Sequence, residues 1–203
     1  HFLSSLGHTI TKGVPSLFPF LCRKALLRSL AGLSFPKVDA ELRVRGRKFK
    51  ESGALLITHQ GLSGPVILRL SSLAALELAQ NDYKAELIVN FFPNRKESDL
   101  EELLLKTKTT QAKKKIQNYC PVNLSDKFWI NLLIVLKIDK DKNWITLSNK
   151  DIKRIISQLL RCSLEISGKD SNQEEFVTCG GINRKEIDFK TMQSKLHPGL
   201  FFA

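Results

Sequence analysis

Long hydrophobic runs are missing from this sequence of 203 residues. No stretch approaches the roughly 18 consecutive apolar residues that a membrane-spanning helix needs. The opening residues, HFLSSLGHTITKG, lack the basic start and long apolar core of a signal peptide. We therefore expect a cytoplasmic protein without membrane contact, whose 42% of apolar residues suffices for a folded core.

Closely spaced metal ligands are absent as well. The four cysteines, Cys22, Cys120, Cys162 and Cys179, form no CxxC pair. The four histidines form no HxH or HxxxH motif. The sequence therefore predicts no metal site, and its cysteines are typical of buried thiols in a reduced, intracellular protein.

An initiator methionine is also absent, because the chain begins at His1 and its single methionine is Met192. The chain ends on Phe201, Phe202 and Ala203, without the polar residues that usually surround a natural terminus. We expect an internal piece of a longer protein. A processed mature protein with an unusual end is the alternative.

Acidic residues are fewer than basic ones, 20 against 32, which gives a net charge of +12. Such an excess raises the hypothesis of nucleic-acid binding. The basic residues are spread along the chain, however, and no aromatic residues alternate with them as a stacking platform requires. The densest group, residues 106–115, is typical of the solvated face of a helix. We therefore do not expect nucleic acid as the partner, because a basic proteome background, or a basic surface facing an anionic cofactor, explains the charge equally well.

Hydrophobic periodicity divides the chain into strands, then helices, then strands. Residues 38–44 alternate between apolar and charged side chains, the period of a half-buried strand. Residues 54–58 and 85–92 predict further strands, and residues 66–78 predict a helix. From residue 94 to residue 162 helical periodicity takes over. Strands at 163–167 and 175–178 predict a hairpin around a polar loop. This order indicates an α+β fold with a small helical domain inserted into the β part.

Capping residues mark the expected helices of the inserted segment. Ser98 with Glu101 three residues later forms a capping-box pattern, and Ser125 and Ser148 each precede an apolar helical pattern. The apolar stripes of these helices are typical of a core.

The first motif that can carry chemistry is THQGLSGP, residues 58–65, between a predicted strand and a predicted helix. Glycines and a serine before a helix can form an anion-binding nest. The motif lacks the Lys-Ser/Thr ending of a P-loop, and Pro65 excludes a G-x-S-x-G nucleophile elbow. From the residues alone, a tight turn that requires glycine and caps the helix is the favoured interpretation.

The second motif is FVTCGGI, residues 176–182. A strand that ends in Gly180 and Gly181 lets the backbone approach another group closely, such as a cofactor ring. A plain junction between strand and turn explains it equally well. Cys179 is more typical of an inert thiol than of a reactive one, because no basic residue adjoins it.

Taken together, these segments resemble one flavoprotein family. THQGLSGPVILRLS resembles the T-H-x-G-x-S-G-P signature of BaiN/RdsA-type NAD(P)/FAD-dependent oxidoreductases, which include aminoacetone-oxidase-like proteins. SLGHTITKGVPSLFPF and VTCGGINRKEIDFKTMQSKLHPGLFFA resemble the stretches that flank that region in the family. The resemblance covers nearly the whole chain and is weakest over residues 94–162.

The resemblance implies an antiparallel β-barrel-like domain, inserted into an FAD-binding domain and itself interrupted by a helical domain. Residues 1–93 and 163–203 would form the barrel with stubs of the FAD-binding domain, and residues 94–162 the helical domain. The family's G-x-G-x-x-G motif, which binds the FAD pyrophosphate, has no counterpart here. We therefore expect this chain to bind no FAD by itself and to need the FAD-binding domain of the same protein as its partner.

The resemblance also implies site residues. Four residues match a T-x-G-G-I turn that lies beside the flavin in related proteins: Thr178, Cys179, Gly180 and Gly181. Five match the family signature, with a role in substrate binding or in building the barrel: Thr58, His59, Gly61, Ser63 and Gly64. In the intact protein FAD is the implied cofactor and NAD(P)H an implied co-substrate. The resemblance identifies no catalytic residue.

Two functional hypotheses follow. In the first, the chain is the substrate-side region of an FAD-dependent oxidoreductase and is inactive alone. In the second, it is a basic binding or interaction module, for example for nucleic acid.

Overall fold

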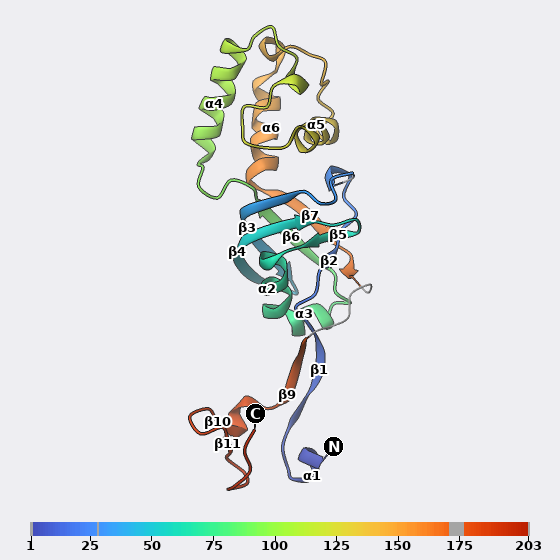
Figure 1. Ribbon diagram of the computed structural model, residues 1–203, viewed down its shortest axis with the longest axis vertical. Helices are drawn as coiled ribbons and strands as arrows, with labels where there is room; N and C mark the ends of the chain where they lie inside the picture. Colours follow the sequence, from blue (N-terminus) through green and yellow to red (C-terminus); the bar gives the residue numbers. More distant parts are fainter. Residues whose placement is uncertain (1, 28, 171–176, 203) are drawn as a thin grey trace.

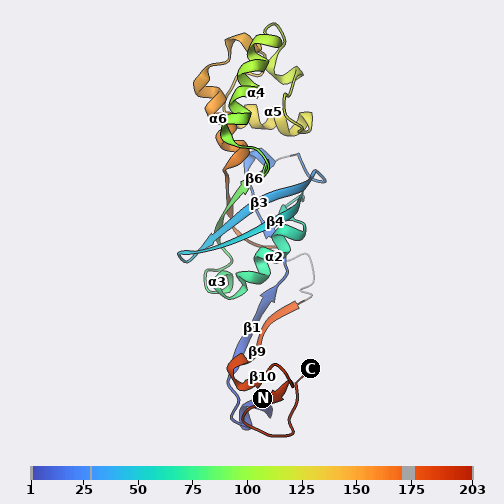
Figure 2. The ribbon, with the colours of Figure 1, turned by 90° about the vertical axis from the view of Figure 1, so that its left-hand side faces the viewer.

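The computed structural model describes residues 2–27, 29–170 and 177–202. Its parts follow one another along the long axis (Figure 1 and Figure 2). Helices α4, α5 and α6 form one end, and a β-sheet with helices α2 and α3 lies in the middle. A two-stranded ribbon then leads to a small lobe near both chain ends.

The middle part is an antiparallel sheet that closes on itself. Its strands run in the spatial order β7-β6-β3-β4-β5-β2-β8. They are β2 (Phe20–Leu21), β3 (Ser34–Val44), β4 (Arg47–Ile57), β5 (Gly61–Ser63), β6 (Ala85–Asn90), β7 (Cys162–Ile166) and β8 (Gly168–Lys169). Only Ser167 separates β7 from β8, so one bent strand pairs with β6 through its first half and with β2 through its second half. The sheet is therefore a barrel, which removes its free edges.

The predicted strand alternation is confirmed on β3. Val38, Ala40, Leu42 and Val44 are buried, while the charged residues between them lie nearer the surface. Strands β4 and β6 confirm the predicted strands at 54–58 and 85–92. The α+β fold with a barrel-like antiparallel sheet is thus confirmed, and its apolar face forms the core.

Helices α2 (Pro65–Leu73) and α3 (Ala75–Ala79) pack on the barrel. The prediction of one helix over 66–78 is wrong, because the chain leaves helical geometry at Ala74, with φ of −104° and ψ of 16°. Ala74 is fully buried, so the break lies where the chain packs against the core.

The helical end contains α4 (Glu97–Thr110), α5 (Asp126–Val135) and α6 (Asn149–Leu160). Two predicted caps are confirmed, because Ser125 accepts a hydrogen bond from the Phe128 amide and Ser148 accepts one from the Asp151 amide. The predicted Ser98 cap is wrong. Helix α4 begins earlier, and the Asp99 carboxylate accepts the Lys96 amide in its place.

An aromatic cluster joins the helical end to the barrel. Phe128 of α5 packs edge-on against Phe35 of β3, with 5.3 Å between ring centroids, and against Phe91 at 5.1 Å. The Phe91 amide donates to the Leu159 carbonyl at 2.9 Å. The chain leaves the barrel after β6, forms the helical end and returns to the barrel at β7. The domain boundaries expected from the sequence, residues 1–93 with 163–203 and residues 94–162, stay a prediction.

The ribbon consists of β1 (Ile10–Ser16) and β9 (Val177–Ile182), which are antiparallel. This corrects the predicted hairpin, since β7 pairs with β6 and β9 pairs with β1. Residues 171–176 of that hairpin, and the chain ends His1 and Ala203, lie outside the described residues. Beyond the ribbon lie α1 (Phe2–Ser5), β10 (Ile187–Asp188) and β11 (Gln193–Ser194). Within the described residues, every helix is too short or too polar to cross a membrane.

Candidate functional site

The THQGLSGP motif begins with a tight turn between β4 and β5. The Thr58 amide donates to the Gly61 carbonyl at 2.9 Å, and the Gly61 amide donates to Thr58 Oγ1 at 3.0 Å. Ser63 pairs with Leu56 inside the sheet, and Gly64 caps α2 with a φ of 96°. The geometry is thus the tight, glycine-dependent turn favoured from the sequence.

Gly61 is required for a different reason from Gly64. It does not adopt a left-handed φ, but a Cβ at this position would overlap the Phe20 carbonyl oxygen and lie 2.6 Å from the Cys22 nitrogen. Strands β5 and β2 therefore approach each other more closely than a side chain permits.

The turn lines a hollow of about 330 Å³ together with Cys22, Arg23, Lys24 and Leu27. Arg23 and Lys24 also line a neighbouring hollow of about 570 Å³ that reaches β7. The Lys24 ammonium donates to the Ser163 carbonyl. Burial raises the pKa of the Cys22 thiol, which keeps it protonated and unreactive at neutral pH. Sequence reasoning missed Arg23 and Lys24, because the barrel fold alone brings them to the turn.

Thr178, Cys179, Gly180 and Gly181 lie on β9, in the exposed ribbon. Gly180 and Gly181 both have left-handed φ angles, of 143° and 110°. A Cβ on Gly180 would lie 2.8 Å from Gly13 Cα of the facing strand. No described atom lies within 4 Å of the corresponding position on Gly181, so that side of the ribbon is open. The structure places the two sequence motifs on different sheets and does not bring them together.

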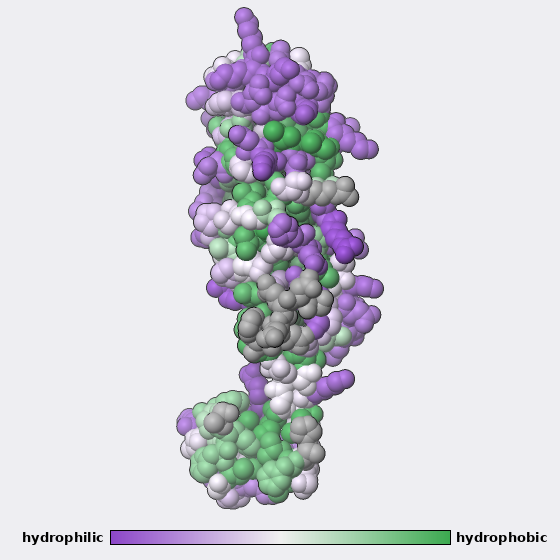
Figure 3. Space-filling model, turned by 45° about the vertical axis from the view of Figure 1, so that its right-hand side comes forward, coloured by the Kyte–Doolittle hydropathy of each residue, from purple (hydrophilic) through white to green (hydrophobic). Residues whose placement is uncertain are grey.

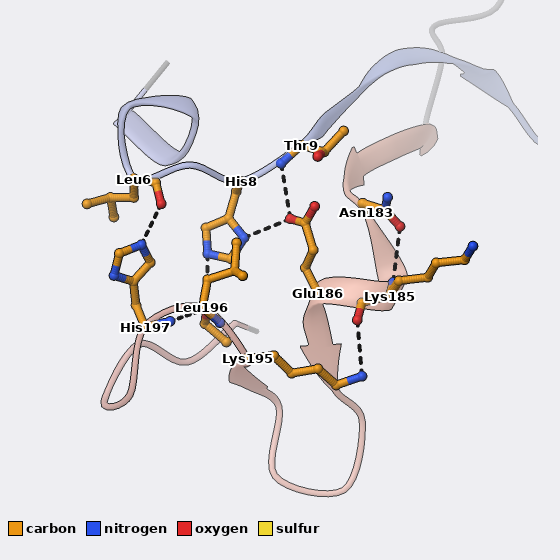
Figure 4. A network of polar contacts seen from close by, with 10 residues as sticks. Leu6, His8, Thr9, Asn183, Lys185, Glu186, Lys195, Leu196 and His197 are labelled. Carbon is orange, nitrogen blue, oxygen red and sulfur yellow. Dashed lines mark hydrogen bonds and ion pairs between the residues drawn. The ribbon is translucent and has the colours of Figure 1, made fainter.

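A partly buried polar network ties the two ends of the chain together next to the ribbon (Figure 4). Glu186 Oε2 accepts from His8 Nδ1 and from the Thr9 amide, each at 3.0 Å, and Ser194 Oγ lies 3.1 Å from His8 Nε2. These contacts with the Thr9 amide and His8 lower the pKa of Glu186. No local pattern indicates this network, since Glu186 lies 178 positions from His8 along the chain.

The contacts that run from Ser194 to His8 and on to Glu186 resemble those of a serine nucleophile, its histidine base and the carboxylate that orients the base. Ser194 Oγ, however, also accepts the amides of Leu196 and His197, each at 3.0 Å. Its two lone pairs are thus occupied, its proton goes to His8 Nε2, and the His8 Nδ1 proton goes to Glu186. Ser194 is also only 5% exposed. We interpret the array as a clamp between chain segments.

The small lobe below the ribbon presents an apolar surface. Phe2 is 74% exposed, Phe201 60% and Phe189 58%, and Met192 and Leu196 are exposed as well. Figure 3 shows that hydrophobic residues dominate the face of this lobe that it displays. A contiguous apolar surface of this kind is typical of an interface.

Comparison with known proteins gives consistent matches. The model of a family described as HI0933-like protein barrel and H2TH domain matches residues 14–177, a range that includes the helical end. The ribosomal RNA dihydrouridine synthase of Escherichia coli strain K12 is 30% identical over 190 residues, which is 92% of this chain and 44% of that protein. The protein of the same name from Haemophilus influenzae is 29% identical over 189 residues, 92% of this chain and 43% of that protein. The chain thus spans less than half the length of these relatives.

Proposed function

The chain belongs to the HI0933-like family of FAD-dependent oxidoreductases, and on this premise we propose that it forms the substrate-side region of a flavoprotein that reduces uridine in ribosomal RNA. The choice of substrate rests on the relatives, which are named ribosomal RNA dihydrouridine synthases. Conversion of uridine to dihydrouridine adds a hydride and a proton across the double bond between C5 and C6 of the base. The flavin, when bound and first reduced by NAD(P)H, would supply the hydride.

The observation that carries this proposal is the open ribbon beside an uncovered apolar lobe. The open side of Gly181 fits a flat ring that approaches the backbone of β9 closely. Thr178, Cys179 and Gly180 lie on the same strand and would border that ring. The residues present therefore fit a flavin, with NAD(P)H as the expected co-substrate.

The apolar lobe supports a packing partner. Its exposed phenylalanines, Phe2, Phe189 and Phe201, are costly to leave in water, since burying one such side chain stabilises a protein by roughly 1.5–3 kcal/mol. We propose that the FAD-binding domain of the same protein covers this surface. Without that domain, the chain alone would hold no flavin and be inactive.

The hollow at the THQG turn supports the substrate side. Arg23 and Lys24 place two cations beside His59, on the rim of a hollow in the barrel wall. Guanidinium and ammonium groups are the usual ligands of RNA phosphates. We propose that these two residues hold the phosphates that flank the target nucleotide, and that Thr58, Gly61, Ser63 and Gly64 build the wall that positions them.

The test uses the full-length protein. We expect visible flavin absorbance, oxidation of NAD(P)H that depends on ribosomal RNA, and loss of dihydrouridine from the ribosomal RNA of a strain that lacks the gene, measured by mass spectrometry. Replacing Arg23 and Lys24 by Gln should raise the KM for RNA and leave the flavin spectrum unchanged. A colourless full-length protein, or unchanged dihydrouridine content in the deletion strain, would disprove the proposal.

A second candidate function is a basic binding module without redox chemistry. The observation in its favour is that residues 94–162 contain 15 basic and 8 acidic residues, and therefore carry +7 of the net +12 charge. Full-length protein that binds RNA without a flavin would favour this candidate.

A further inference from the structure

Two loops at the far end of the helical part bring together lysines that are distant in the sequence. The Ile116 amide donates to the Lys142 carbonyl at 2.9 Å, and the Trp144 amide donates to the Lys114 carbonyl at 3.0 Å. The backbones of residues 112–117 and 140–145 thus run side by side, with a β-bridge between Lys115 and Asn143. This end faces away from the ribbon (Figure 1), and hydrophilic residues cover it (Figure 3).

We call this surface the lysine-rich pole. Its members are Lys113, Lys114, Lys115, Lys140, Lys142 and Lys150, all of which are exposed. Lys115 forms an ion pair of 2.9 Å with Asp141, and its proximity lowers the pKa of that carboxyl. Lys114 lies over the Tyr119 ring at 5.0 Å. The pole therefore keeps a large positive excess after its internal ion pair is counted.

The pole has a rigid base. The rings of Trp129 and Trp144 stack beneath the loops, with centroids 6.1 Å apart and an angle of 12° between planes, and both residues are fully buried. Trp129 Nε1 donates to the Ile116 carbonyl at 2.9 Å. Because the loop backbone is already ordered, binding a ligand costs little further backbone entropy, and only the lysine side chains must be fixed.

Further basic residues lie near the start of α6. A helix N-terminus carries partial positive charge and favours acidic residues. The first turn of α6 contains both Lys150 and Asp151, and Lys153 and Arg154 follow in the second turn, where Arg154 pairs with Asp151 at 2.9 Å. With Asn149 and Ser157, these basic residues line a shallow hollow of about 480 Å³. Lys150 and Lys153 thus extend the positive surface of the pole to the start of α6.

We propose that the lysine-rich pole binds the phosphate backbone of RNA, at a distance from the flavin-side ribbon. A lysine ammonium is a point charge and lacks the bidentate fork of arginine. It suits phosphates, whose recognition requires charge more than a fixed hydrogen-bond geometry. The choice of RNA over other polyanions rests on the proposed function. The pole would hold structured RNA while Arg23 and Lys24, on the barrel, act near the target base.

The test compares two triple variants of the full-length protein. The pole variant replaces Lys113, Lys140 and Lys142 by Gln, which leaves the Lys115–Asp141 pair intact. The control replaces three exposed barrel lysines by Gln and removes the same charge. These are Lys37, Lys48 and Lys84. Fluorescence anisotropy with a labelled short RNA duplex gives Kd over a range of salt concentrations.

Each lost phosphate contact lowers the slope of log K against log salt by about 0.9, so we expect the slope of the pole variant to fall by about 3. An increase from about 50 to 200 mM salt should then weaken the parent about 40-fold more than the pole variant. The control should keep the parent slope. Replacing the same three pole lysines by Arg should restore it, which separates charge from folding.

Equal slopes for the parent and the pole variant would overturn the proposal, as would an equal loss in the control. The proposal would also be overturned if the pole lysines were needed for binding to vesicles of anionic lipid but not for binding to RNA. Flavin absorbance and dihydrouridine formation are measured separately in each variant. A protein that reduces uridine normally while the slopes are equal would overturn only the role of the pole, whereas a protein without flavin would overturn only the proposed function.

Discussion

Replacing Gly61 by Ala tests whether close contact between strands holds the THQG turn in place. The added methyl group would overlap the Phe20 carbonyl oxygen and crowd the Cys22 nitrogen, so β2 must move away from β5. Overpacking of this kind costs typically 1–3 kcal/mol. The hydrogen bond of 3.1 Å from the Cys22 amide to the Gln60 carbonyl is lost as well, at about 1 kcal/mol.

These two contributions give an expected destabilisation of about 3 kcal/mol. For a folding unit of about 150–250 residues, such as this region, that corresponds to a fall of roughly 6–12 °C in the melting temperature of the unit. Circular dichroism of the full-length protein measures the melting temperature, and hydrogen exchange at residues 20–22 reports whether β2 opens locally.

The matched control is Gly168→Ala on β8, the other neighbour of β2. A Cβ there would lie 3.4 Å from Leu21 Cδ1, an ordinary contact, and the residue does not have a left-handed φ. We expect a change of less than about 1 kcal/mol, since the loss of unfolded-state freedom favours alanine. Equal melting temperatures for the two variants would refute the reasoning that the backbone contact requires glycine.

Two further predictions concern buried polar contacts. Hydrogen bonds from the Thr9 amide and from His8 lower the pKa of Glu186. These contacts therefore stabilise the fold above the unfolded pKa of about 4.3 and are lost as pH falls through the folded value. The difference in Tm between the parent and Glu186→Gln should therefore shrink on acidification, and a constant difference would contradict this. In urea unfolding, Trp129→Phe should cost about 1 kcal/mol more than Trp144→Phe, because only the first removes a hydrogen bond. The Ile116 carbonyl loses the 2.9 Å bond from Trp129 Nε1 and keeps the longer one of 3.4 Å from the Tyr119 amide. Equal costs would mean that this hydrogen bond contributes nothing.

The strands and caps that depend on neighbouring residues could be predicted from the sequence. The alternation over residues 38–44 predicted a strand with one buried face, and Ser125 and Ser148 predicted helix starts, because period and cap chemistry are local. The Ser98 cap was wrong, since α4 already begins at Glu97, and the Asp99 carboxylate accepts the Lys96 amide at its start.

Contacts between distant segments could not be predicted in this way. The pairing of β9 with β1 joins residues more than 160 positions apart, as Val177 with Ser16 shows, and no local pattern reports it. Gly61 was correctly placed in a turn, but the reason for glycine lies on β2, not in its own φ. Arg23 and Lys24 were missed for the same reason.

The entire helical end is, in topological terms, one long loop of a hairpin. Val89 near the end of β6 is paired directly with Cys162 at the start of β7, so the chain leaves and re-enters the barrel at adjacent strands, about 5 Å apart. A short turn could join the same two strands without breaking any pair of the barrel. The helical end can therefore change in length or content without altering the strand pairing of the barrel or of the ribbon.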